Sequence, residues 1–186
     1  MSLDKRIPCF LALSIVLMLS IAYGADNKPA DLPLKPEALL QEINLKGARA
    51  VVIELYKNSN VWDAVLKKIA TGNRSWLEIA VALRPGSDAG SSEMLTLAVG
   101  EALEHNPTTV LQVAPKAFQL SSVCSGPDVD DHRYDSYELS MKAINRRIEK
   151  LSTIKDRSLL NPSKKCIGHL EESKKGIAQF YGIEKK

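Results

Sequence analysis

Hydrophobic residues recur at helical spacing through most of the chain after residue 35. Between residues 36 and 120 they form short blocks separated by glycine, proline, asparagine or serine, which favour turns and helix ends. The 48–56 block is rich in β-branched residues, but it lacks a neighbouring strand pattern and we interpret it as helical. The pattern predicts helices over 36–47, 48–56, 60–72, 73–85, 90–105 and 106–120.

A longer and more regular pattern occupies the last third of the chain. Its apolar residues alternate three and four positions apart, which is typical of one narrow packing face on a long helix: Tyr134, Tyr137, Met141, Ile144, Ile148 and Leu151. A last helix carries a matching set at Ile167, Leu170, Ile177 and Phe180. We expect these two faces to pack on each other. The sequence therefore predicts an all-α fold, with one helical domain over 36–186 and an extended leader over 25–35.

The middle of this pattern consists of short helix pairs joined by polar turns. The segment WLEIAVALRPGSDAGSSEMLTLAVGEALEHN, residues 76–106, is one such pair. It resembles HEAT-like helical repeats, in which each antiparallel pair stacks on the next. The resemblance covers about eighty residues and implies a small stacked array followed by the long helix and a C-terminal helix.

The N-terminus has the charged, apolar and small-residue order of a secretory signal peptide. Lys5 and Arg6 precede the apolar run FLALSIVLMLSIA, and the run ends at Ala22-Tyr23-Gly24. Crossing a bilayer takes about twenty apolar residues, and this run is shorter. We expect residues 1–24 to be removed, with an uncleaved anchor as the alternative. The mature protein is then periplasmic or extracellular, without stable membrane insertion.

Cysteine content adds a covalent link to this picture. Cys9 leaves with the signal peptide, so the mature chain keeps Cys124 and Cys166. Cysteines of exported proteins usually pair, because no reducing pool keeps them as thiols. The sequence predicts a Cys124–Cys166 disulfide. If the last helix folds back along the long one, this bond requires either an extended 125–131 loop or a 154–165 loop that runs back.

Charge is divided unevenly along the chain. Residues 25–137 hold eleven Lys/Arg and fifteen Asp/Glu, whereas residues 138–186 hold twelve and six. An exported protein rarely meets nucleic acid, so we expect none as a partner. The basic excess is interpreted either as a solvated helix face or as a docking face for an acidic protein partner, formed by Lys142, Arg146, Arg147 and Lys150.

The segment SSVCSGPDVDDHRYDSY, residues 121–137, is the densest in reactive groups. Its aspartates do not follow an EF-hand, since that loop needs glycine at its sixth position and glutamate at its twelfth. Asp130 or Asp131 is predicted to be the N-cap of the long helix, whose first N–H groups need acceptors. The alternative is a small hydrolase or metal-dependent enzyme centred on Ser125, Asp128, His132 and Asp135.

Sequence motifs for catalysis are absent from the chain. It contains no HExxH, GxSxG, P-loop or dinucleotide-binding pattern, and we expect no cofactor. These observations favour an exported, non-enzymatic helical module that binds another protein, such as an envelope component or a toxin that it neutralises.

Overall fold

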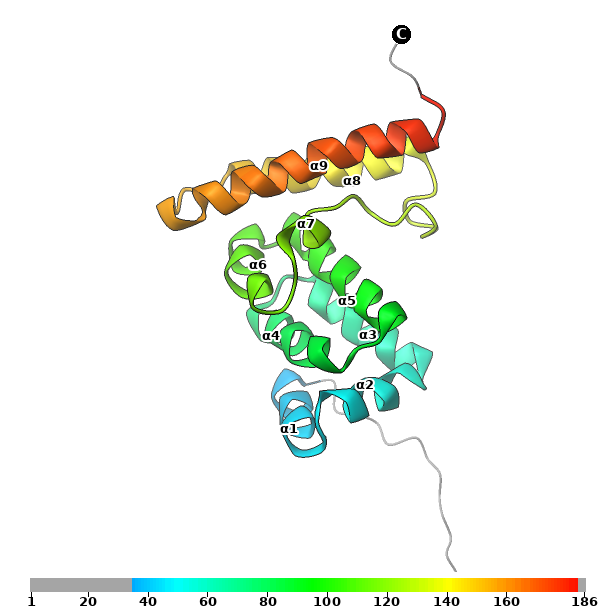
Figure 1. Cartoon of the computed structure of the whole chain (residues 1–186), viewed down its shortest axis with the longest axis vertical. Helices are drawn as coiled ribbons and strands as arrows, with labels where there is room; N and C mark the ends of the chain where they lie inside the picture. Colours follow the sequence, from blue (N-terminus) through cyan, green and yellow to red (C-terminus); the bar gives the residue numbers. More distant parts are fainter. Residues whose placement is uncertain (1–34, 184–186) are drawn as a thin grey trace, which may run out of the picture. The chain divides into compact units, whose positions relative to one another are not determined.

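The computed structural model describes residues 35–183. Every regular element in this range is helical and none is a strand, which confirms the all-α prediction. The predicted signal peptide, and all of the predicted leader except Lys35, lie outside the described residues. The α-helices labelled in Figure 1 are α1 (Pro36–Lys46), α2 (Ala48–Tyr56), α3 (Ser59–Ala70), α4 (Arg74–Leu83), α5 (Ala89–Glu101), α6 (Pro107–Val113), α7 (Leu120–Val123), α8 (Tyr137–Ser152) and α9 (Leu160–Phe180). Short 3-10 turns are η1 (Arg84–Gly86), η2 (Ala102–Glu104), η3 (Ala114–Lys116) and η4 (Arg157–Leu159).

Polar side chains begin several helices in the first two thirds of the chain. Asn58, Asn73 and Asn106 each accept a hydrogen bond from a backbone N–H in the first turn of α3, α4 and α6. Asp88 and Ser91 form a reciprocal capping box at the start of α5. These caps satisfy N–H groups that lack partners within a helix, so the polar turns in the sequence set the element boundaries.

Helices α1 to α6 pack on one another around a single apolar core. Direct contacts join α1 to α2 and α4, α3 to α5, and α4 to α6. Trp62, Leu77 and Leu95 are among the fully buried side chains. Gly86 packs directly on the backbone of Ala48 and Arg49, where a side chain would collide. The Pro85-Gly86 turn thereby holds η1 against α2.

Helices α8 and α9 form a pair that lies over the rest of the domain (Figure 1). Ile144 and Leu151 of α8 and Leu170 and Ile177 of α9 are buried, as the apolar spacing predicted. Phe180 differs, because its side chain is 64% exposed. Within residues 35–183, no helix has both the length and the apolar character needed to span a bilayer.

The disulfide joins Cys124, the residue after α7, to Cys166 of α9. The sulfur atoms of Cys124 and Cys166 are 1.99 Å apart, both residues are buried, and the predicted pairing is confirmed as a contact of the folded chain. After Cys124 the chain runs alongside α9, since the Gly126 N–H donates to Ser173 Oγ at 3.1 Å. Of the two loop arrangements predicted, the extended segment after Cys124 is the one observed.

The predicted N-cap of the long helix is wrong. Helix α8 begins at Tyr137, and Ser136 is its N-cap, with Oγ accepting from the Leu139 N–H at 3.2 Å. Asp131 lies too early in the chain, and its carboxylate instead accepts from the Arg133 N–H at 2.9 Å. The Asp130 backbone N–H donates to Asp128. The aspartates therefore stabilise turns ahead of α8 rather than the helix end.

Candidate binding site

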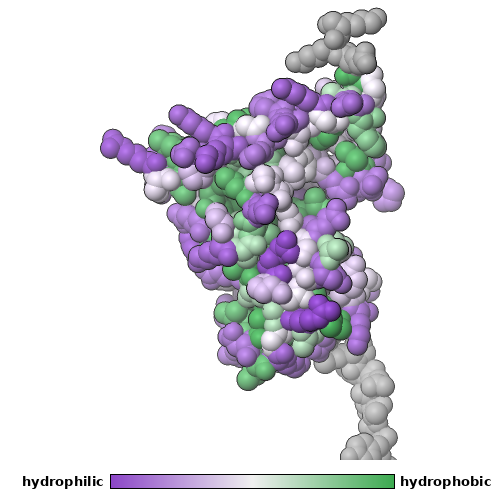
Figure 2. Space-filling model, in the orientation of Figure 1, coloured by the Kyte–Doolittle hydropathy of each residue, from purple (hydrophilic) through white to green (hydrophobic). Residues whose placement is uncertain are grey.

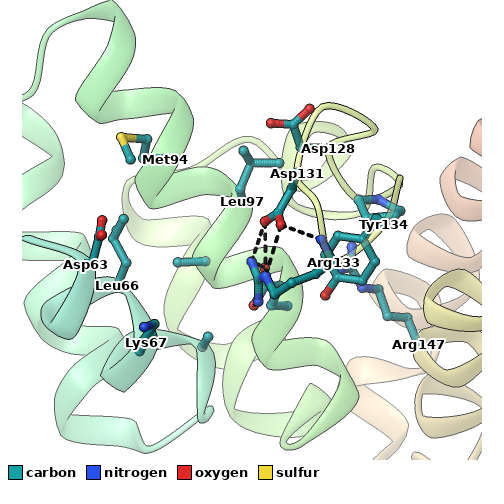
Figure 3. Close-up of a pocket in the computed structure, with 14 residues that line it drawn as sticks. Asp63, Leu66, Lys67, Met94, Leu97, Asp128, Asp131, Arg133, Tyr134 and Arg147 are labelled. Atoms are coloured by element: carbon teal, nitrogen blue, oxygen red, sulfur yellow. Dashed lines mark hydrogen bonds and ion pairs between the residues drawn. The ribbon is translucent and has the colours of Figure 1, made fainter. Parts of the chain in front are cut away.

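A cavity of about 310 Å³ lies between α3, α5 and the segment 126–136 (Figure 3). We call it the groove. Its floor is largely apolar, and α3 and α5 supply Leu66, Ala70, Met94, Leu97 and Ala98. Its rim is charged, with Asp63 and Lys67 on α3, Glu101 on α5, and Asp128, Asp131 and Arg133 on the 126–136 segment. An apolar floor with a few polar groups is the usual composition of a ligand pocket.

Arg133 ties the 126–136 segment to α5. Its guanidinium donates to both oxygens of Glu101, at 2.6 and 3.0 Å, and to Asp131 Oδ2 at 2.6 Å. It also lies over the Tyr134 ring, 5.2 Å from the centroid. Figure 3 shows the Asp131 and Arg133 side chains turned toward each other. Because a two-pronged guanidinium–carboxylate contact fixes orientation, Arg133 holds this wall of the groove in place.

The surroundings of this wall shift the pKa values of three of its residues. The Arg133 hydrogen bond holds the pKa of Asp131 below its ordinary value. Hydrogen bonds to Asp131 and then Glu101 raise the pKa of Arg133. Burial raises the pKa of Tyr134. Asp131 and Arg133 are therefore charged at neutral pH and serve as a fixed ion pair.

Arg147 of α8 closes the inner end of the groove. Its side chain is only 2% exposed. Its Nε donates to Glu104 Oε1 at 3.3 Å, and its Nη1 donates to the Ser125 carbonyl at 3.1 Å. Its Nη2 is buried and has no hydrogen-bond acceptor in the described part of the chain. A buried donor without an acceptor is rare in folded proteins, and Nη2 has almost no surface that a molecule in the groove could touch.

The docking face predicted on α8 is partly wrong. Lys142, Arg146 and Lys150 are exposed, but Arg147 faces inward because it neutralises Glu104 and caps the Ser125 carbonyl. Arg146 also contacts Glu104, at 2.8 Å. Hydrophilic side chains project along the α8–α9 pair in Figure 2. The exposed basic face is therefore smaller than the sequence pattern indicated.

No hydrogen bond or ion pair of the described residues joins the four residues of the predicted enzyme centre to one another. Ser125 Oγ donates to the Ser122 carbonyl at 2.8 Å. His132 and Asp135 are exposed, and Asp128 accepts from the Asp130 N–H on the groove rim. Across residues 35–183, no group of three or more His, Cys, Asp and Glu side chains is placed to hold a metal ion.

Sequence reasoning missed the roles of Glu101, Glu104 and Arg133. Arg133 lies 32 residues from Glu101, and Arg147 lies 43 residues from Glu104. No local spacing reports pairs so far apart in the chain. The sequence does show Glu101 and Glu104 three positions apart at the end of an apolar helix. Carboxylates so placed lie near the core and require cationic partners.

Comparison with known proteins provides no relative for this site. No protein-family model matches the chain, and neither does any curated protein or solved structure. The likeness to HEAT repeats stays a prediction from the sequence pattern.

Proposed function

We propose that this chain is an exported, non-enzymatic helical module that binds another protein through the groove. The observation that carries the proposal is the groove's construction. Its apolar floor is surrounded by charged side chains that are already held by one another, as in the Arg133 contacts with Glu101 and Asp131. A rigid apolar pocket with a polar rim is the form that anchoring side chains of a protein partner occupy.

The exposed cations of α8 supplement this site. Lys142 and Lys150 take part in none of the ion pairs found within residues 35–183. Arg146 shares Glu104 with Arg147, and Arg147 lines the groove, so the basic face and the groove are connected. A partner with an acidic border around an apolar anchor fits both features.

Export is the second part of the proposal, and it rests on two observations. The N-terminal sequence has the order of a signal peptide, and the Cys124–Cys166 bond suits an oxidising compartment. The function class does not depend on the destination, which is the periplasm or the extracellular space.

Photo-crosslinking from neighbouring lysine positions tests the proposal. Lys67 and Lys68 are both exposed on α3, but only Lys67 lines the groove. A photoreactive amino acid at each position, in full-length protein made in its own host, should give a discrete crosslinked protein from position 67 and not from 68. The product should disappear when Leu97→Asp places a charge on the floor. Equal products from both positions, or none from 67, would contradict protein binding at the groove.

A further inference from the structure

The charges around the groove indicate which side chain of the partner enters it. We infer that the groove takes one long cationic side chain, lysine or arginine, whose aliphatic stem covers the apolar floor and whose charged head meets the carboxylates of the rim. This inference rests on the proposed function and specifies the chemistry of the partner's anchor.

Carboxylates outnumber the accessible cations in the lining of the groove. The lining contains four acidic and three basic side chains: Asp63, Glu101, Asp128, Asp131, Lys67, Arg133 and Arg147. Arg147 is buried and pairs with Glu104, which does not belong to the lining. The four carboxylates therefore share the groove with two accessible cations. This excess of negative charge favours a cationic ligand.

Two of the four carboxylates are free to meet a ligand. Glu101 and Asp131 share the guanidinium of Arg133. Asp63 and Asp128 are exposed, and they take part in none of the ion pairs found within residues 35–183. In Figure 3 they stand on different walls of the groove, Asp63 on α3 and Asp128 on the 126–136 segment. A cationic head above the floor is therefore attracted from both walls.

The floor suits the aliphatic stem of such a side chain. Leu66, Ala70 and Leu97 are partly exposed there. Lysine and arginine cover apolar surface with their methylene groups while the charged head stays in water. The cavity of about 310 Å³ is at the small end of ligand pockets, which commonly hold about 300–1,000 Å³. We therefore expect it to hold one side chain rather than a longer segment.

Other occupants match fewer of these features. A purely apolar side chain would cover the floor but leave Asp63 and Asp128 without a cation. A metal ion needs ligands around one point, and in the described part of the chain no three His, Cys, Asp or Glu side chains are so placed. The exposed cations Lys142 and Lys150 lie outside the lining, so an acidic border of the partner can meet α8 while its anchor carries the opposite charge.

Three small peptides, acetyl-Ala-X-Ala-amide, test the inference by NMR at pH 6.5. X is lysine, norleucine, which keeps the stem without the charge, or 2,4-diaminobutyric acid, which keeps the charge on a stem two methylenes shorter. Titrated into full-length mature protein, the lysine probe should give saturable shifts at the Leu66 and Met94 methyl groups. Both other probes should bind at least about threefold more weakly. Added salt should weaken binding of the lysine probe and not of the norleucine probe. Equal affinity for lysine and norleucine, or no saturable shift with lysine, would overturn the inference.

Removing the two free carboxylates tests their role directly. Asp63→Asn/Asp128→Asn keeps an acceptor oxygen at both positions, so residue 128 can still accept from the Asp130 N–H. This variant should bind the lysine probe no more tightly than the norleucine probe, and the norleucine probe as the wild type does. Unchanged affinity for the lysine probe would overturn the role of the rim.

A second variant controls for net charge. Glu93→Gln/Asp130→Asn removes the same charge from exposed positions outside the groove lining. It should keep most of the wild-type affinity for the lysine probe. An equal loss in the two variants would show that overall charge, and not the rim of the groove, attracts the probe.

The crosslinking and the peptide titrations fail in different ways. A crosslink from position 67 without a preference for the lysine probe would retain protein binding and reject the cationic anchor. A preference for the lysine probe without a crosslink would retain the ligand chemistry and reject a protein partner at the groove.

Discussion

Adjacent arginines on α8 have opposite environments. The Arg147 side chain is 2% exposed and contacts Glu104 and the Ser125 carbonyl, whereas the Arg146 side chain is 49% exposed and contacts Glu104 alone. Helical geometry turns successive residues toward different sides, so one cation enters the core while its neighbour meets solvent. Composition alone describes both as basic surface residues, and this is why the predicted docking face included Arg147.

The same substitution at the two positions should therefore have unequal effects. Arg147→Met leaves the Ser125 carbonyl without its donor and removes one cation from Glu104, so we expect a loss of about 3 kcal/mol in the free energy of unfolding. Arg146→Met should cost less than about 1 kcal/mol, as exposed ion pairs do. Urea unfolding of both variants measures the difference, and equal losses would show that Arg147 is not held as a buried donor.

Asp131 should make stability depend on acid pH. Its folded-state pKa is lowered by the Arg133 hydrogen bond, so its contribution is complete above the ordinary aspartate pKa of about 3.9. That contribution is lost as pH falls through the lower folded-state pKa. Asp131→Asn should thus be less stable than the wild type at pH 7, and the gap should close at the acid end.

The neighbouring Asp130→Asn is the control for this pH effect. The Asp130 side chain makes no ion pair within the described residues. Urea unfolding should give the same stability for this variant and the wild type at both pH values. A gap for Asp131→Asn that widens in acid would contradict the ion-pair role.

At the scale of elements, apolar spacing identified the helices but not all of their ends. The spacing from Tyr134 to Leu151 predicted one helix with one packing face, and the face is correct. Tyr134 nevertheless lies in the turn before the helix, where its carbonyl accepts from Ser140 Oγ. Hydrophobic periodicity reports which residues share a core, and a residue in a turn can share it too.

The start of α8 provides a direct test at this scale. Ser136→Ala removes the Oγ that accepts from the Leu139 N–H, so we expect a loss of about 1 kcal/mol in the free energy of unfolding. Asp130→Ala should cost almost nothing, because its side chain does not cap the helix. Urea unfolding measures the loss of stability in each variant. A larger loss for Asp130→Ala than for Ser136→Ala would show that Asp130, and not Ser136, caps the helix.

The disulfide links two elements that are far apart in sequence. Cys124 and Cys166 are 42 residues apart, and closing a loop of this length restricts the unfolded chain by about 4 kcal/mol in the chain-entropy treatment. Reductant should lower the wild-type melting temperature and leave a Cys124→Ala/Cys166→Ala variant unchanged. Two titratable thiols in freshly purified, unreduced protein would contradict the bond.

For the molecule as a whole, the sequence predicted the fold class but not the groove. Caps, turns and apolar blocks are local, so helices α1 to α6, α8 and α9 follow from short stretches of chain. The helix predicted over 106–120 instead ends as α6 at Val113, and the short α7 was not predicted. The groove depends on contacts such as Arg133 with Glu101, which form only after distant segments pack. Candidate chemistry was therefore sought within residues 121–137, while the structure combines that segment with α3, α5 and α8.

The division of charge along the molecule leads to a last prediction. The basic excess of residues 138–186 contrasts with the acidic excess before it, and opposite charges on two proteins speed and strengthen their encounter. Lys142→Glu/Lys150→Glu reverses two exposed cations that lie outside the groove lining. The yield of the position-67 crosslink should fall several-fold, and more steeply at low salt than at high salt, because ions screen exposed charges.

Reversing charge elsewhere separates a local effect from one of net charge. Lys57→Glu/Lys68→Glu makes the same change in net charge at exposed positions that belong neither to α8 nor to the groove lining. If the α8 face attracts the partner, this variant should keep most of the crosslink yield. Equal losses of crosslink yield in the two variants would mean that overall charge governs association. An unchanged yield in Lys142→Glu/Lys150→Glu would show that the α8 face is not part of the binding surface, and binding at the groove would stand.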